Sequence, residues 1–84
     1  MSQPFSNNQL KKRISVLVFL KGTTAPLVLY VENPLALYEE LSQVLKTNSQ
    51  VAKIIEKTTV GPVKKVCILS TQICAVALQE EQYM

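Results

Sequence analysis

The sequence predicts an α+β domain: an antiparallel five-stranded sheet in β-β-α-β-β-β order, with one helix packed on one face. Three observations predict it. Runs rich in Val, Ile and Leu flank a helical repeat, the connections between them are short and contain Gly, Pro or Asn, and 84 residues suit a single domain. We expect residues 1–12 to form a flexible arm, residues 13–80 the folded domain, and residues 81–84 a polar tail.

The first two expected strands form a hairpin. Residues 14–21 (ISVLVFLK) and residues 26–32 (PLVLYVE) have the composition of strands, and a four-residue turn that contains Gly separates them. A turn of this length places Leu20 opposite Leu27.

The helix is expected to begin at Asn33-Pro34, because Asn is a favoured N-cap and Pro is tolerated at the first helical position. Over residues 35–46 the apolar side chains recur at helical spacing. These are Leu37, Tyr38, Leu41, Val44 and Leu45.

Residues 51–58 fit two interpretations. Their apolar spacing suits a helix, but their β-branched content favours a strand, and we predict a strand. Two more strands, residues 64–69 and 73–79, are expected around a turn at residues 70–72.

Three short motifs carry a resemblance to a known family. They are Ala36-Leu37-Tyr38 in the expected helix, Lys64-Lys65, and residues 70–76 within KKVCILSTQICAVAL. From about Ile14 to Leu78 the chain resembles a family of small uncharacterised proteins from cyanobacteria and some plastids. That resemblance implies a role in the photosynthetic cell, and it carries over no established activity.

Both faces of the first hairpin are apolar, and 48% of all residues are hydrophobic. One helix can cover only one face of a sheet, and a contiguous exposed apolar patch usually marks an interface. We therefore expect a second subunit to cover the face without the helix; the alternative is a sheet that curls closed within one chain. The face without the helix carries Leu17, Phe19, Val28 and Tyr30.

Catalysis is not expected. The chain has no His and no Asp, so it lacks the usual proton shuttle, the commonest metal ligand and the usual third member of a nucleophilic triad. We predict neither an enzyme nor a cofactor or metal site. No apolar run approaches the length of a membrane span or a signal peptide, and we expect a cytoplasmic protein without membrane contact.

The two cysteines, Cys67 and Cys74, lie among aliphatic residues and are expected to be buried thiols. A turn at Ser70-Thr71 would instead place them opposite each other as a redox pair, an alternative that a shift of one residue removes.

The net charge of +3 raises the question of nucleic-acid binding. The basic clusters are modest and stacking aromatics are few, so we place this function second. The leading hypothesis is a non-enzymatic interaction module that forms a homodimer and binds a further protein partner. The identity of that partner, the biological process and the oligomer number stay open. The expected basic patch consists of Lys11, Lys12, Arg13, Lys64 and Lys65.

Overall fold

The computed structural model describes residues 11–47 and 50–83. The expected arm, apart from its last two residues, lies outside this range. Strand β1 begins at Lys11 and strand β5 continues to Tyr83, so two residues of the expected arm and three of the expected tail belong to strands.

In chain order the elements are β1 (Lys11–Leu20), β2 (Leu27–Leu29), α2 (Pro34–Thr47), β3 (Ile54–Thr58), β4 (Lys65–Leu69), the 3-10 turn η1 (Ser70–Gln72) and β5 (Ile73–Tyr83).

The strands form two antiparallel sheets. Sheet A has the order β2-β1-β5, and sheet B contains β3 and β4. The α+β class and the order of elements are confirmed, but the expectation of one five-stranded sheet is wrong. The turn η1 is the physical reason: it redirects the chain, so that β4 pairs with β3 and β5 pairs with β1 instead of with β4.

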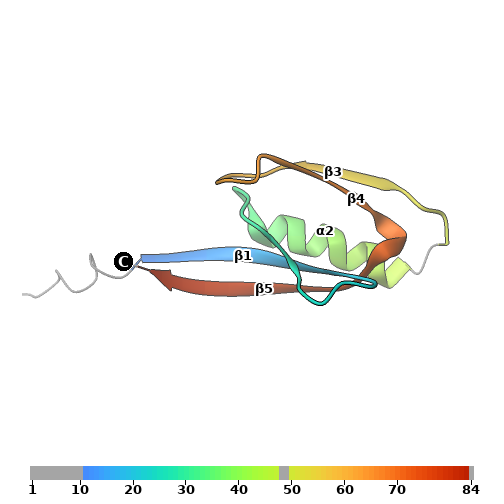
Figure 1. Ribbon diagram of the computed structural model, residues 1–84, viewed down its shortest axis with the longest axis horizontal. Helices are drawn as coiled ribbons and strands as arrows, with labels where there is room; N and C mark the ends of the chain where they lie inside the picture. The colour runs from blue at the N-terminus through green and yellow to red at the C-terminus, as the bar shows by residue number, and fades with distance from the viewer. Residues whose placement is uncertain (1–10, 48–49, 84) are drawn as a thin grey trace, which may run out of the picture.

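Helix α2 lies between the two sheets, and the β1–β5 pair extends well beyond the end of the helix (Figure 1). The helix packs on sheet A through its inward stripe, and sheet B contributes to the same core. Alternation along β1 turns Val16 and Val18 into this core, where both are fully buried. The buried apolar side chains are Val16, Val18, Leu29, Leu37, Leu41, Ile68 and Ile73.

The β1–β2 hairpin has a different register from the one expected. Val18 pairs with Leu27, whereas the sequence predicted Leu20 opposite Leu27. The connection is longer than four residues, because Lys21 leaves the hairpin and its N–H donates to the carbonyl of Gln72 at 2.8 Å. A shift of two residues keeps each side chain on its predicted face, since side chains alternate with a period of two.

The expected start of α2 is confirmed. Pro34 is its first residue, and the Oδ1 atom of Asn33 accepts a hydrogen bond from the N–H of Ala36 at 3.2 Å. On its flank α2 carries Glu40, whose carboxylate lies 2.7 Å from the ammonium group of Lys57 on β3. This ion pair joins the helix to sheet B.

The strand predicted within residues 51–58 is confirmed and spans Ile54–Thr58. Sheet B turns Ile68 into the core, with Ile55 and Val66 packed against it. Its tip is held to sheet A where the N–H of Val60 donates to the carbonyl of Tyr30 at 2.7 Å. Sheet B therefore closes over the helix from the side of β2.

Candidate functional site

The candidate site is the outer face of sheet A, the face turned away from α2. Pairing places Leu17 between Val28 and Ala77, and Phe19 beside Ala75. The neighbouring Val16 and Val18 point to the opposite face, where they are fully buried under the helix. The outer face thus carries the four expected interface residues together. Its members are Leu17, Phe19, Val28, Tyr30, Ala75 and Ala77.

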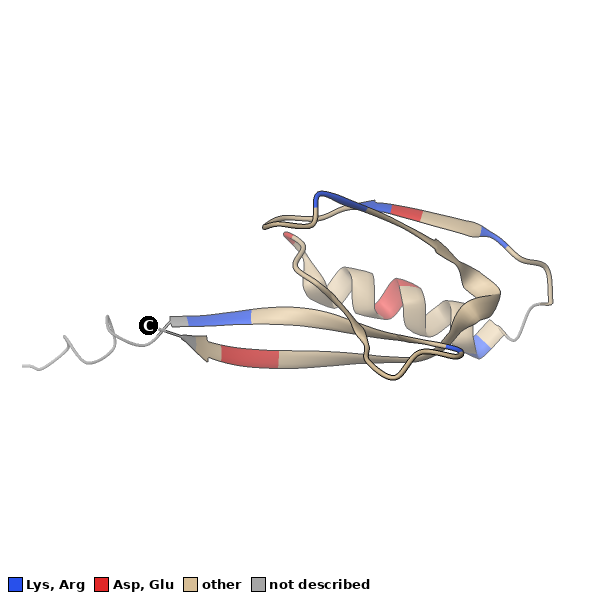
Figure 2. Ribbon diagram, viewed as in Figure 1, with Lys and Arg blue, Asp and Glu red and all other residues tan. Residues whose placement is uncertain are grey.

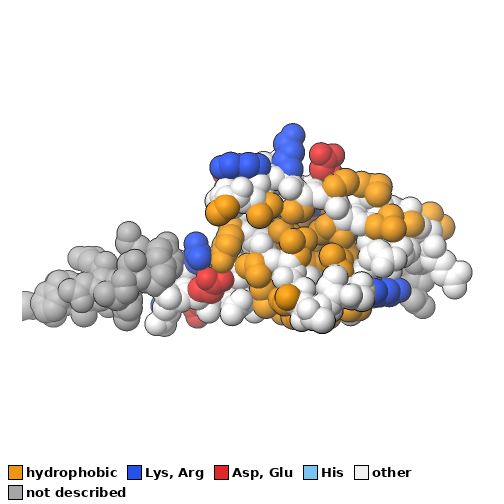
Figure 3. Space-filling model, viewed as in Figure 1, with side chains coloured by type: hydrophobic (Ala, Val, Ile, Leu, Met, Phe, Trp, Pro, Cys, Tyr) orange, Lys and Arg blue, Asp and Glu red, His pale blue; other side chains and the backbone are white. Residues whose placement is uncertain are grey.

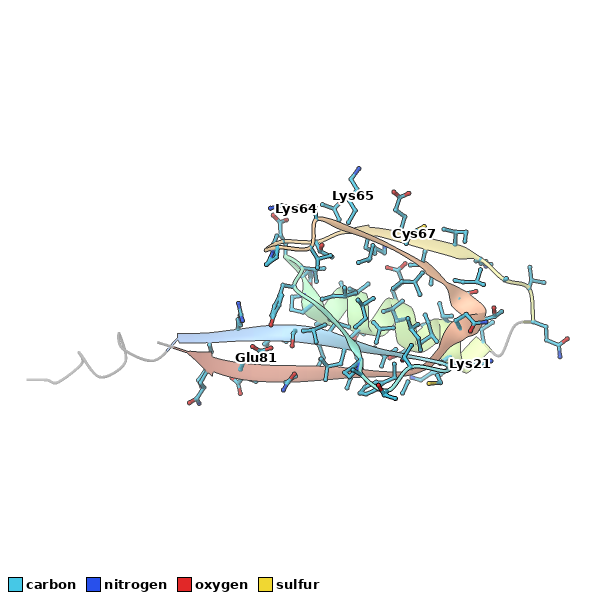
Figure 4. The ribbon with its side chains drawn as sticks, in the orientation of Figure 1. Lys21, Lys64, Lys65, Cys67 and Glu81 are labelled. Carbon is cyan, nitrogen blue, oxygen red and sulfur yellow. The ribbon has the colours of Figure 1, made fainter. Side chains whose placement is uncertain are left out.

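One end of this face is organised by the carboxylate of Glu81 (Figure 4). Its Oε2 atom accepts hydrogen bonds from the Ser15 hydroxyl at 3.0 Å and from the Tyr30 hydroxyl at 3.1 Å. Its Oε1 atom accepts from Nε of Arg13 at 3.3 Å, and the Arg13 guanidinium lies 4.2 Å from the centre of the Tyr30 ring. We call these four residues the Glu81 cluster.

The hydrogen bonds in the Glu81 cluster shift two pKa values. Desolvation acts to raise the pKa of Glu81, but hydrogen bonds from Ser15, Tyr30 and Arg13 outweigh it, so this pKa lies below its ordinary value. The pKa of Tyr30 is raised, first by desolvation and then by its hydrogen bond to Glu81, against the opposing charge of Arg13. Glu81 therefore stays ionised and Tyr30 stays protonated at neutral pH.

The sequence did not single out Glu81 or Ser15. Glu81 was assigned to the expected tail, and Ser15 is a small polar residue within an apolar strand. The one signal was the opposite charge of the segments at the two ends of the chain, with Lys12 and Arg13 early and Glu80 and Glu81 late. Antiparallel pairing of β1 with β5 brings these charges together.

The expected basic patch is divided between two sheets. Lys12 and Arg13 lie on sheet A, where Glu80 is 3.7 Å from Lys12 and Glu81 is 3.3 Å from Arg13. Lys64 lies just before β4 and Lys65 is its first residue, and in the view of Figures 2 and 4 both stand above the β1–β5 pair. Acidic partners therefore offset part of the charge that a nucleic-acid backbone would need.

The two cysteines are exposed free thiols, so the prediction of buried thiols is wrong. They do not form a hairpin pair, because Cys67 belongs to sheet B and Cys74 to sheet A. Cys74 sits at the irregularity opposite Phe19–Leu20, and its thiol lies 3.2 Å from the carbonyl oxygen of Phe19. The alternation of sheet B points Cys67 outward, beside Glu56.

A cavity of about 480 Å³ lies between α2 and β3. The facing charges of Glu40 and Lys57 in its wall form the ion pair described above, and the residues that line it include no thiol or imidazole. Within residues 11–47 and 50–83, no group of three or more His, Cys, Asp or Glu side chains could hold a metal ion.

Comparison with known proteins adds no relative: no family model, curated protein or solved structure matches the chain. In the part of the chain that the structure describes, no helix has the length and apolar character needed to cross a membrane.

Proposed function

We propose that this protein is a non-enzymatic interaction module that forms a homodimer through the outer face of sheet A. The observation that supports the proposal is the set of apolar side chains gathered on that face, while α2 and sheet B both lie on the other face. A sheet with one face in water normally alternates apolar with polar residues. Here the outward positions Leu17, Phe19 and Val28 break that rule.

A partner on this face would bury further apolar area. A large apolar side chain contributes about 1.5–3 kcal/mol when it moves from water to a packed interior. The large residues of the outer face are half-buried, so each has part of this free energy left to gain. Contiguous patches of this kind are typical of protein interfaces.

A second copy fits this face because the face is electrically self-complementary. Among its described side chains, the charged groups of Arg13 and Glu81 lie 3.3 Å apart and neutralise each other. Packing two such faces across a two-fold axis therefore buries no uncompensated charge. In such a contact, the Arg13–Glu81 pair of each copy faces the outer face of sheet A of the other copy.

The test is the mass of the purified chain in solution, measured by analytical ultracentrifugation. Phe19→Lys places a charge on the outer face, beside Leu17 and opposite Ala75, and we expect it to halve the mass of the assembly. Ile54→Lys is the matched control, because Ile54 is 65% exposed and lies on sheet B. Val28→Gln serves as a second, milder variant on the same face.

Circular dichroism checks that each variant retains its fold. A wild-type chain that remains monomeric at millimolar concentration would contradict the proposal. A Phe19→Lys variant that is folded and keeps the wild-type mass would also contradict it.

A further inference from the structure

Strand β5 is an open edge of sheet A. Among residues 11–47 and 50–83 it is bonded to β1 alone, in the order β2-β1-β5, although it spans 11 residues. Natural proteins usually protect such an edge with lysine, proline or a bulge. In β5 the irregularity opposite Phe19–Leu20 protects only the beginning, and residues 73–78 (ICAVAL) contain neither a charge nor a proline. This edge is therefore available for pairing.

Helix α2 carries a second apolar stripe beside this edge. Leu41 points to sheet A, and Glu40 points to sheet B through its ion pair with Lys57. At about 100° per residue, Tyr38 and Leu45 lie on the flank opposite Glu40. Since sheet B closes the side of β2, that flank lies above β5.

The helix stripe and the strand edge form one surface, which we call the β5 edge surface. It faces away from β2 and from sheet B. Three of its members are large apolar residues with exposed side chains: Leu35 is 54% exposed, Leu45 36% and Leu78 39%. Tyr38 and Val76 are half-buried and complete it. Figure 3 shows the side of the molecule on which β2 lies. That side also carries hydrophobic side chains.

We propose that a second copy of this chain pairs with the β5 edge surface across a two-fold axis, with β5 antiparallel to β5. The result is a continuous six-stranded sheet in which the two α2 helices pack side by side. Neighbouring strands lie about 4.8 Å apart. Because α2 packs over β5 and β1, the two helix axes then lie about 10 Å apart, which is a normal helix-packing distance.

The α2 stripe is self-complementary in an antiparallel pair. When the two antiparallel helices lie level at Glu40, Leu35 of one copy lies opposite Leu45 of the other, and Tyr38 lies opposite the small side chain of Ser42. The helix ends are complementary in charge as well. Exposed Glu32 precedes the helix, and exposed Lys46 in its last turn approaches Glu32 of the second copy.

This inference goes beyond the proposed function, because it uses a different surface and does not require the outer face of sheet A. If both contacts form and their two-fold axes intersect at right angles, the assembly is a tetramer in which each single contact defines a dimer. The two hypotheses can therefore fail separately.

The test compares masses by analytical ultracentrifugation. Leu35→Glu introduces a carboxylate into the β5 edge surface at an exposed position in the first turn of α2, where a negative charge suits the helix dipole. We expect a tetrameric wild type, a dimer for Leu35→Glu, a dimer for Phe19→Lys and a monomer for the double variant. Ile54→Lys remains the control.

The outcomes separate the two proposals. A wild-type mass for folded Leu35→Glu, with a lower mass for Phe19→Lys, overturns the β5 edge contact and leaves the outer-face dimer. A lower mass for Leu35→Glu alone supports the edge contact and overturns the outer-face dimer. A monomeric wild type overturns both.

Amide hydrogen exchange gives a readout that does not depend on mass. In an isolated edge strand, only the amides directed at β1 are bonded, so alternate residues exchange quickly. Pairing of β5 with β5 protects the outward amides of residues 75–78 too. We expect those amides to exchange about tenfold or more faster in Leu35→Glu than in the wild type. Equal rates in both proteins would overturn the edge contact.

Discussion

At the scale of single residues, Glu81 joins segments that are distant in the sequence. Its carboxylate accepts hydrogen bonds from Ser15 and Arg13 on β1 and from Tyr30 beyond β2. Ser15 is fully buried, so its hydroxyl needs this acceptor. The cluster therefore fixes the end of the outer face that faces away from the hairpin turn.

The first prediction concerns the pH dependence that Glu81 gives the fold. The pKa of Glu81 is lower in the folded chain than the ordinary value of a glutamate, because its carboxylate accepts hydrogen bonds from Ser15, Tyr30 and Arg13. A carboxylate of this kind stabilises the fold above its ordinary pKa, and that contribution is lost as the pH falls through the lowered pKa. Glu81→Gln should therefore lower the free energy of unfolding at pH 7, and its difference from the wild type should shrink toward pH 3.

Urea denaturation at pH 7, 5, 4 and 3 measures this difference. Glu56→Gln provides the comparison, because Glu56 is an exposed carboxylate on sheet B. A Glu81→Gln variant whose destabilisation is the same at every pH would contradict the assignment.

Residue-level features that depend on periodicity were predictable, and those that depend on tertiary environment were not. The division of β1 into an inner face with Val16 and an outer face with Leu17 follows from alternation alone, and it survived a register shift of two residues. The exposure of Cys67 did not follow, because its neighbours along the chain are aliphatic while its face of sheet B is turned to solvent.

At the scale of elements, α2 was the most predictable part of the chain because its signals are local. The second prediction tests its N-cap. Asn33→Ala removes the acceptor for the N–H of Ala36, and we expect a loss of about 1 kcal/mol in the free energy of unfolding. Asn33→Asp should retain most of the stability, because a carboxylate can also accept the hydrogen bond from the N–H of Ala36 and its negative charge interacts favourably with the helix dipole.

Thermal and urea denaturation of both variants measures the cap. An alanine variant as stable as the wild type would show that the side chain of Asn33 contributes nothing to the start of the helix.

The arrangement of the strands was less predictable than their positions. Each strand was found near its expected place, but the partners of β4 and β5 depend on η1, three residues whose sequence reads equally well as a tight hairpin turn. Strand pairing depends on residues that are far apart in the sequence. Here β5 can pair either with β4, its neighbour along the chain, or with the long strand β1, and it pairs with β1. A pattern of alternation records which residues are apolar but does not record which strand lies beside them.

At the scale of the whole molecule, the proposed self-association predicts a stability that depends on protein concentration. A dimer that unfolds to monomers gains about 2.7 kcal/mol, or about 1.4 kcal/mol per protomer, for each hundredfold rise in concentration. For a domain of this size, about 4–8 °C in Tm corresponds to 1 kcal/mol, so we expect the Tm of each dimeric single variant to rise by roughly 5–11 °C from 5 to 500 μM, and that of the tetrameric wild type to rise further.

Differential scanning calorimetry across this range provides the measurement, and variants separate the sources of the shift. Phe19→Lys and Leu35→Glu should each retain a concentration-dependent Tm, because each leaves one contact intact. The double variant should have the same Tm at both concentrations, since a monomer unfolds without a change in the number of particles. A wild-type Tm that does not change with concentration would mean that the outer face and the β5 edge both meet water in the free protein, and the proposed assembly would then have no thermodynamic support.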